Sequence, residues 1–186
     1  MNTIIYATTN KDKHYKAQIN LKPYGISLSH QKLEMQEMQT SSGDEIVRHK
    51  AEQAFEHFQQ PVLVNDDSWS IPALGGFPST GMKLCNDFLV AEDWLRLMKG
   101  VADRRIFLLS YYAYYDGKSI KTIMGRDERF FLEKAKGKHP GAPCLEVVAR
   151  KNTHLSIAEE IKIGRRIEQN KTKFWKKLAI ILRGYP

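Results

Sequence analysis

The sequence is poor in cysteine and has no long apolar run. Only two of its 186 residues are cysteines, Cys85 and Cys144, which are too few for a disulfide framework. No stretch reaches the roughly 20 consecutive apolar residues of a membrane-spanning helix. The opening residues, MNTIIY, lack the basic start and the long apolar stretch of a signal peptide. We therefore expect a protein of the reducing cytoplasm with no membrane segment.

Several motifs that are typical of particular chemistries are also missing. The chain has no G-x-x-x-x-G-K-[ST] phosphate loop, no G-x-G-x-x-G and no G-x-S-x-G nucleophile turn. Its histidines, His139 and His154 among them, show no zinc-ligand spacing. The sequence also contains no internal repeat and no low-complexity tail. None of these classes of site is therefore indicated by a sequence motif.

What the sequence does have is an ordinary globular composition and a positive charge. Hydrophobic residues make up 42% and charged residues 27%, which is enough apolar material for the core of one domain. The net charge is +8 at pH 7. A positive field attracts polyanions such as nucleotides, pyrophosphate or nucleic acid, without choosing among them. The alternative is that the excess charge only keeps the protein soluble.

Hydrophobic periodicity predicts an α/β fold with a mixed central sheet flanked by helices. Residues 31–43 and 134–143 are predicted to be loops. Asp116-Gly117 is a hairpin signal, so the strands that flank it are expected to be antiparallel. We expect strands at 3–8, 26–29, 61–65, 105–115, 120–131 and 145–149, and helices at 10–22, 44–58, 87–98 and 169–182.

The first candidate site is T-T-N-K-D-K, residues 8–13, between the first strand and the first helix. Backbone N–H groups at a helix N-terminus lack intrahelical partners, and with the helix dipole they form an anion site. Thr8 and Asn10 can add side-chain hydrogen bonds, and Lys13 can reach a phosphate as a point charge. The alternative is that Asn10 is an N-cap and that the lysines are solvated.

The second candidate site is N-D-D-S-W-S-I-P-A-L-G-G-F-P, residues 65–78. Asp66 and Asp67 follow an apolar run, at the predicted end of a buried strand. Adjacent carboxylates there favour a divalent cation such as Mg²⁺, or can align and deprotonate a water molecule. The alternative is a solvated Asx-type turn.

Scattered basic residues form a third candidate group. Lys50 lies in the second predicted helix and Lys83 follows the Gly-Gly-Phe-Pro turn, while Arg165, Arg166 and Lys171 lie near the end of the chain. Each alone is more often part of a solvated face than a ligand. Together with the basic stretch 171–177, they leave open a nucleic-acid-binding protein whose affinity would fall steeply with salt.

Taken in order, these motifs resemble those of the inosine triphosphate pyrophosphatase family. That family opens with a strand and T-x-N-x-x-K, here Thr8, Asn10 and Lys13. A helix with an acidic start and a lysine follows, here residues 44–50. Then comes P-V-[LI]-V, an acidic pair and A-L-G-G-x-P, here residues 61–78, with a later lysine that matches Lys83.

The resemblance implies a two-lobed α/β fold with a long mixed sheet and an active-site cleft between the lobes. It also implies a homodimer that uses Mg²⁺ to hydrolyse a nucleoside triphosphate to the monophosphate and pyrophosphate. Asp66 falls on the family's catalytic aspartate, and Lys13 assists it at the phosphates. The implied nucleotide-binding residues are Thr8, Asn10, Lys13, Lys50, Lys83, Arg165, Asn170 and Lys171, and the candidate metal ligands are Asp66, Asp67 and Asp44.

Several positions depart from the family pattern. Asn65 replaces an acid, and the family's metal-binding glutamate aligns with Ser42, for which Asp44 or Glu37 could substitute. Residues 139–143, H-P-G-A-P, replace the aromatic segment that stacks on the purine. The leading hypothesis is a pyrophosphatase with altered base specificity. The alternatives are a catalytically weak or inactive nucleotide-binding protein on the same fold, and a basic nucleic-acid-binding protein.

Overall fold

The computed structural model describes residues 3–164 and 173–184, in two compact units. The first unit comprises residues 1–66, 110–125 and 167–186, and the second comprises residues 67–109 and 126–166. Within the described ranges, no helix is both long enough and apolar enough to cross a membrane.

The predicted α/β fold with a mixed sheet is confirmed. Seven strands run in the order β2-β1-β3-β5-β6-β7, and β4 pairs with β3. Strand β1 is parallel to β2 and β3, whereas β3 with β4 and β6 with β7 are antiparallel. The strands are β1 Thr3–Ala7, β2 Ser27–Gln31, β3 Val62–Ser70, β4 Pro78–Ser79, β5 Arg105–Tyr115, β6 Ile120–Phe131 and β7 Val148–Arg150.

The helices begin and end at residues whose chemistry suits those positions. Asn10, Ser42 and Ser156 cap the starts of α1, α2 and α5 with their side chains. The final helix, predicted at residues 169–182, is described from Lys173 onward. The α-helices are α1 Lys11–Leu21, α2 Gly43–Phe58, α3 Met82–Phe88, α4 Ala91–Leu97, α5 Ile157–Lys162 and α6 Lys173–Arg183, with short 3₁₀ turns at Lys22–Tyr24, Pro72–Leu74 and Pro143–Glu146.

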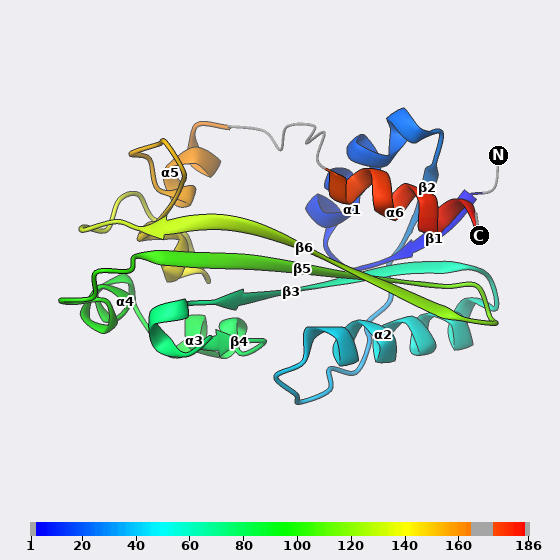
Figure 1. Ribbon diagram of the computed structural model, residues 1–186, viewed down its shortest axis with the longest axis horizontal. Coiled ribbons are helices and arrows are strands. Elements are labelled where there is room, and N and C mark those ends of the chain that lie inside the picture. The colour runs from blue at the N-terminus through cyan, green and yellow to red at the C-terminus, as the bar shows by residue number, and fades with distance from the viewer. Residues whose placement is uncertain (1–2, 165–172, 185–186) are drawn as a thin grey trace. The chain divides into compact units, whose positions relative to one another are not determined.

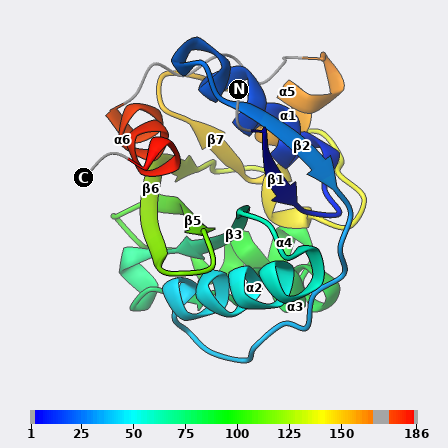
Figure 2. The ribbon, with the colours of Figure 1, turned by 90° about the vertical axis from the view of Figure 1, so that its right-hand side faces the viewer.

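The strands of the first unit bury alternate side chains on opposite faces. On one face, Tyr6 and Leu63 pack with apolar residues of α1 and α6. On the other, Ala7 and Val64 pack with the apolar face of α2. Figure 2 shows α2 on one side of the strands and α6 on the other. The connection from β1 to β2 therefore runs over one face, and the connection from β2 to β3 runs over the other.

The second unit has a core of its own around Trp94, whose side chain is fully buried. Trp94 lies 6.4 Å from Phe131 of β6, measured between ring centroids. Apolar residues of α3, α4 and the 143–146 turn complete this cluster. Figure 1 shows the strands β3, β5 and β6 and the helices α3 and α4.

The predicted C-terminal boundary of the strand at residues 61–65 is wrong. Strand β3 continues to Ser70, so both aspartates lie inside it rather than in a loop after it. The extension pairs with β4, where Trp69 faces Ser79, and its buried Trp69 belongs to the core of the second unit. Pairing with β4 and the burial of Trp69 thus accompany a strand that continues through N-D-D-S despite its low strand propensity.

Two further elements differ from the prediction. The helix expected at 87–98 is two helices, because Leu89 and Val90 are extended and the Asp93 side chain accepts the Val90 N–H at 2.9 Å, which starts a new helix. The strand expected at 145–149 is a 3₁₀ turn followed by β7, since Pro143 favours the first position of a helical turn.

Gly43 allows α2 to begin against β5. A Cβ atom at this position would overlap the ring of Tyr111, with Cζ only 2.8 Å away. We expect Gly43→Ala to lower the free energy of unfolding by about 1–3 kcal/mol through overpacking, measured by urea denaturation. The same change in a Tyr111→Leu background should cost much less. An equal cost in both backgrounds would contradict the steric explanation.

Candidate active site

The carboxyl end of β1 is a topological switch point in the first unit. Strand β1 lies between β2 and β3 and is parallel to both, and Tyr6 of β1 pairs with Leu63 of β3. The helices α1 and α2, which follow β1 and β2 in the chain, cover opposite faces. In open α/β sheets, ligands bind outside the carboxyl ends of strands at such a point. The loop after β1 and residues 65–66 of β3 both lie there.

The loop after β1 is held by its own side chains. The Thr8 hydroxyl accepts the Asn10 N–H at 3.1 Å. The Asn10 carboxamide oxygen accepts the N–H groups of Asp12 and Lys13 at 2.9 and 3.1 Å. The N-cap interpretation of Asn10 is therefore confirmed, and the cap uses two of the N–H groups that an anion would otherwise find. None of these hydrogen bonds uses the N–H of Thr9, a residue that is exposed.

On β3, Asp66 is joined to a buried lysine. The Lys50 Nζ lies 2.6 Å from Asp66 Oδ1 and 3.6 Å from Glu37 Oε1. Lys50 is 8% exposed, because it projects from the buried face of α2, next to Val47 and Ala51. A buried ammonium is costly unless it is paired, so the pairing fixes Asp66 and Lys50 together. The Lys50 ammonium thus contacts both the Asp66 carboxylate of β3 and the Glu37 carboxylate of the loop before α2.

The segment that carries Glu37 has no regular secondary structure but is tied to α2. The Gln53 side-chain amide accepts the Gln36 N–H at 2.8 Å and donates to the Gln36 carbonyl at 3.0 Å. Nearer α2, the Thr40 hydroxyl donates to Glu45 at 2.8 Å. These contacts hold the backbone next to Glu37 in place. The amide of Gln53 therefore helps to position the acid near Lys50.

Comparison with known proteins identifies the family. The Ham1 family matches residues 4–142 of the chain. This chain belongs to the Ham1 family. A dITP/XTP pyrophosphatase from Methanosarcina acetivorans is 30% identical over 169 residues, which cover 89% of this chain and 92% of the relative. One from Saccharolobus solfataricus is 28% identical over 130 residues, 70% of this chain and 68% of the relative.

The fold agrees with solved Ham1 structures. A HAM1 protein from Coxiella burnetii superposes with a TM-score of 0.76 at 18% identity, over 100% of both chains. At this identity the likeness shows the fold alone. It confirms the mixed-sheet α/β fold expected for a Ham1 chain, and the family match confirms the resemblance that was read from the sequence.

Asn65, which stands where an acid was expected, lies on the opposite face of β3 from Asp66. Successive strand residues alternate in direction, and the Asn65 side chain accepts the Tyr6 hydroxyl at 2.7 Å in the buried layer under α1. Asn65 is 7% exposed. The replacement of the expected acid by Asn65 therefore affects a buried hydrogen bond with Tyr6 and leaves the group around Lys50 unchanged.

Asp44 has other partners. Its carboxylate pairs with Arg48 at 2.6 Å, one turn along α2, and also bonds with Thr122. Burial opposes ionisation, but the hydrogen bonds from Thr122 and Arg48 outweigh it and lower the pKa of Asp44. A lowered carboxyl pKa stabilises the fold above the unfolded pKa, and this stability is lost as the pH falls through the folded value. Asp44 therefore supports the start of α2.

Two predicted residues belong to the second unit. Asp67 follows Asp66 in β3, so their side chains leave the strand on opposite faces. Its charge acts on Arg129, whose guanidinium is buried 5.0 Å from the Trp69 ring and 3.0 Å from Asp127 Oδ2. Burial lowers the pKa of Arg129, although Asp127 and Asp67 oppose the shift. Lys83 is exposed on α3.

The remaining candidates fall near the end of the chain. Arg165, Asn170 and Lys171 lie outside the described residues. The 139–143 segment forms a turn in which the His139 N–H donates to buried Glu146 at 3.1 Å and the Ala142 N–H donates to the His139 carbonyl at 3.3 Å. This turn supplies no Phe, Tyr or Trp, and its one aromatic ring is the His139 imidazole.

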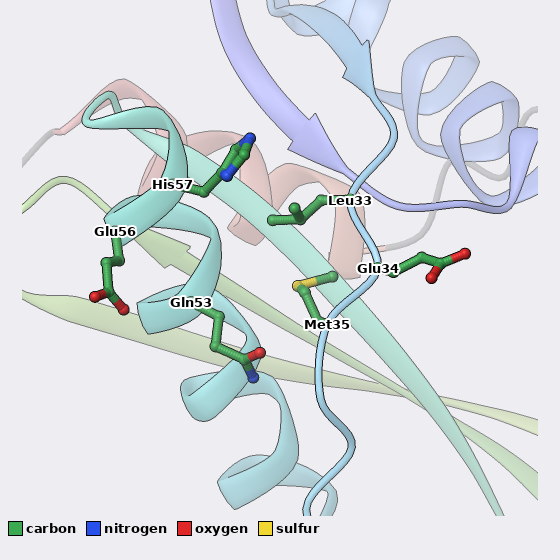
Figure 3. A pocket seen from close by; sticks show the side chains of 6 residues that line it. All are labelled: Leu33, Glu34, Met35, Gln53, Glu56 and His57. Carbon is green, nitrogen blue, oxygen red and sulfur yellow. The ribbon is translucent and has the colours of Figure 1, made fainter.

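An open pocket of about 470 Å³ lies in the first unit between α2 and the segment after β2. Figure 3 shows its wall of Glu56 and Gln53 from the helix opposite Leu33 and Met35 from the segment. Lys50 and Asp66 do not line it. The pocket is therefore separate from the ammonium–carboxylate group, although the segment that carries Glu37 forms one of its sides.

The residues around Lys50 offer two carboxylates that could hold a divalent metal ion, rather than a full protein cage. Among the described residues, no cluster of three or more histidine, cysteine or acidic side chains could hold a metal ion. Mg²⁺ typically takes one or two carboxylates and completes its shell with water and substrate phosphates. Asp66 and Glu37, gathered by one ammonium, supply that number. Asp44 belongs to a different ion pair.

From the sequence, Glu37 was named only as a possible substitute for the family's metal-binding glutamate, beside Asp44. The sequence alignment placed the family glutamate at Ser42, but the Ser42 hydroxyl accepts the Glu45 N–H at 3.3 Å and caps α2. The sequence signal for Glu37 was only an acid in the loop before α2. Its proximity to Lys50 depends on contacts between residues 17 apart, Gln36 and Gln53, which no local pattern reveals.

Proposed function

We propose that this Ham1 protein hydrolyses nucleoside triphosphates to the monophosphate and pyrophosphate with the help of Mg²⁺. The observation that carries the proposal is the Asp66–Lys50–Glu37 group, in which Asp66 stands within β3 just past the pairing of β3 with β1. The curated relatives named above are dITP/XTP pyrophosphatases. A metal-binding acid pair beside an anion-binding loop is the arrangement that such a reaction requires.

The triphosphate is bound by the loop after β1. Thr8 and Asn10 shape this loop, and the N–H of exposed Thr9 and the Lys13 ammonium are the proposed donors for phosphate oxygens. Lys13 offsets charge on the phosphates that leave as pyrophosphate. Lys83, Arg165, Asn170 and Lys171 are proposed as nucleotide-binding residues from the sequence resemblance alone.

The metal-binding residues are Asp66 and Glu37. When bound, Mg²⁺ neutralises phosphate charge and polarises the phosphorus–oxygen bond. Asp66 Oδ1 is held by Lys50, so its second oxygen is directed to the metal or to the attacking water. As water adds to the α-phosphorus, Asp66 orients it and accepts its proton, and the bond to the bridging oxygen of pyrophosphate breaks. Asp67 and Asp44 remain the alternative metal ligands.

The proposed substrates are deaminated purine nucleotides, with altered base specificity. The 139–143 turn lacks the aromatic ring that would stack on a base, and stacking is worth about 1–3 kcal/mol per base. We therefore expect weaker discrimination between inosine, xanthosine and ordinary purine triphosphates than an aromatic platform would give. We also propose a cytoplasmic homodimer, for which light scattering would give twice the mass of the 21.5 kDa chain.

The test is a panel of nucleoside triphosphates assayed for pyrophosphate release with and without Mg²⁺. Turnover of inosine or xanthosine triphosphate that needs the metal supports the proposal. No release from any triphosphate at high enzyme concentration would exclude it. Binding by calorimetry without release would favour the second candidate, a nucleotide-binding protein, which Asn65 and the altered turn motivate. A basic nucleic-acid-binding protein would instead retard DNA or RNA at low salt.

Replacing Glu37 tests which acid accompanies Asp66. We expect Glu37→Gln to raise the Mg²⁺ concentration for half-maximal pyrophosphate release about tenfold or more, because one of two anionic ligands is lost. Glu34→Gln removes an exposed acid three residues away and should leave this concentration unchanged. If this Mg²⁺ concentration rose in Asp44→Asn but not in Glu37→Gln, the second metal ligand would be Asp44 instead of Glu37.

A further inference from the structure

Two histidines of the first unit stack on each other beside the loop after β1. His14 lies in the first turns of α1, and His30 lies in β2, where it pairs with Tyr6 of β1. Their ring centroids are 4.7 Å apart with an interplanar angle of 13°. The Tyr6 ring lies 6.0 Å from His14 on the same side of the sheet. The pair is thus enclosed by α1, β1 and β2.

Both imidazoles contact backbone carbonyl groups. His30 Nε2 lies 2.9 Å from the Thr8 carbonyl oxygen, and His14 Nε2 lies 3.4 Å from that of Leu28. A carbonyl oxygen only accepts, so each Nε2 is assigned the proton. The Thr8 N–H in turn donates to the Gln31 carbonyl at 3.0 Å. Strand β2 and its histidine therefore fix both the N–H and the carbonyl of Thr8.

Fixing the Thr8 carbonyl also fixes the next N–H. The peptide bond between Thr8 and Thr9 is planar, and in the trans form its carbonyl and N–H point in opposite directions. His30 holds the carbonyl toward β2, so the Thr9 N–H is turned away from β2. The Thr8 hydroxyl and the Asn10 cap shape the turn that follows.

We propose that His30, supported by the stacked ring of His14, is a positioning residue that aims the Thr9 N–H at the polyphosphate of the substrate and that the histidine pair takes up a proton when the polyphosphate binds. The inference rests on the proposed function, since it concerns the same phosphate-binding loop. It assigns to these histidines a role in orienting the loop, without contact with the reacting atoms.

The surroundings of His14 favour its neutral form when no anion is bound. Burial lowers the pKa of His14, and the neighbouring His30 lowers it further, although the bond to the Leu28 carbonyl opposes the shift. Asp12 is the one acid on the surrounding elements of the described chain. The titratable groups there are Lys11, Asp12, Lys13, Tyr15 and Lys16 of α1, Tyr6 of β1, His30 of β2, Lys32 just after β2, and Lys173, Lys176, Lys177 and Arg183 of α6.

A bound polyphosphate reverses this balance. Its negative charge stabilises a protonated imidazole, so the affinity for polyphosphate should rise as the pH falls through the pKa of His14. The sign for the unliganded fold is opposite. A histidine pKa lowered by folding gives stability above the unfolded value near 6.5 that is lost as the pH falls.

The experiment measures binding of inorganic pyrophosphate and inosine triphosphate, with Mg²⁺, to four proteins. His30→Leu removes the donor, whereas His30→Gln places an amide N–H at similar reach. We expect His30→Leu to raise Kd and KM about three- to tenfold, the effect of one hydrogen bond, with kcat within twofold of wild type. His30→Gln should restore most of the affinity. His57→Leu, an exposed histidine on α2, is the matched control.

Proton uptake is measured by calorimetry in two buffers of different ionisation enthalpy. At pH 7 we expect uptake by wild type and its loss in His14→Leu. Three outcomes would each overturn the inference while leaving the proposed function intact. They are an unchanged affinity in His30→Leu, an affinity of His30→Gln as low as that of His30→Leu, and proton uptake that persists in His14→Leu. If wild type binds neither pyrophosphate nor inosine triphosphate, the proposed function itself fails.

Discussion

Asp66→Asn should reduce pyrophosphate release about 10²–10⁴-fold, because the carboxylate that holds the metal and accepts the proton of the attacking water is lost. The amide oxygen can still accept a hydrogen bond from Lys50, which lies 2.6 Å from the carboxylate in the wild type. The protein should therefore fold normally and bind nucleotide within about tenfold of wild type, since its phosphate-binding loop is unchanged.

The measurement pairs a pyrophosphate-release assay with nucleotide calorimetry and thermal denaturation. Glu34→Gln, which neutralises an exposed acid of the same unit, is the charge-matched control and should retain full activity. Turnover by Asp66→Asn at the wild-type rate would show that Asp66 has no catalytic role. If Asp67→Asn alone abolished turnover, the catalytic carboxylate would be the one on the other face of β3.

Lys50→Met should impair both stability and activity. The substitution leaves the Asp66 carboxylate, whose side chain is only 19% exposed, without its ammonium partner. Breaking a buried pair in this way costs about 3–5 kcal/mol, and the partial exposure of Asp66 reduces the expected loss to about 1–3 kcal/mol. Pyrophosphate release should fall about 10²–10³-fold, since positive charge near the triphosphate is lost.

A double variant separates these two effects. Lys50→Met with Asp66→Leu replaces the ion pair by one apolar side chain on the buried face of α2 and one on β3, so most of the lost stability should return. Activity should stay absent, because both functional groups are gone. Urea denaturation and pyrophosphate release measure the two quantities. A double variant that is less stable than Lys50→Met would show that the two residues are not coupled.

Much of the fold follows from local sequence patterns. The helix at 44–58 was predicted from apolar residues at helical spacing and an acidic start, and α2 spans Gly43–Phe58. Asp116-Gly117 was predicted to form a turn, and the Asp116 carboxylate accepts the N–H groups of Lys118 and Ser119 at 2.8 Å. Such features depend on neighbouring residues, so one sequence is enough to reveal them.

The rest depends on contacts between distant segments. The extension of β3 through Asp66 and Asp67 comes from pairing with β4 and from burial of Trp69, whereas the local sequence resembles a turn. The position of Glu37 depends on Gln53. The stacked histidines belong to a helix and a strand that are separated by 16 positions in the chain, 14 and 30. Motif order identified Asp66 and Lys50, but the partners of these residues required the structure.

The two proposed metal ligands differ in how they are anchored. Asp66 stands on a strand that is paired within the sheet, while Glu37 stands on an irregular segment fastened to α2 by the amide of Gln53. Of the two proposed metal ligands, Asp66 is therefore held rigidly, and the position of Glu37 is adjustable. Insertions or substitutions in residues 32–42 could retune the spacing of the two acids, and with it the preferred size of the divalent ion, while the strand that carries the chemistry stays as it is.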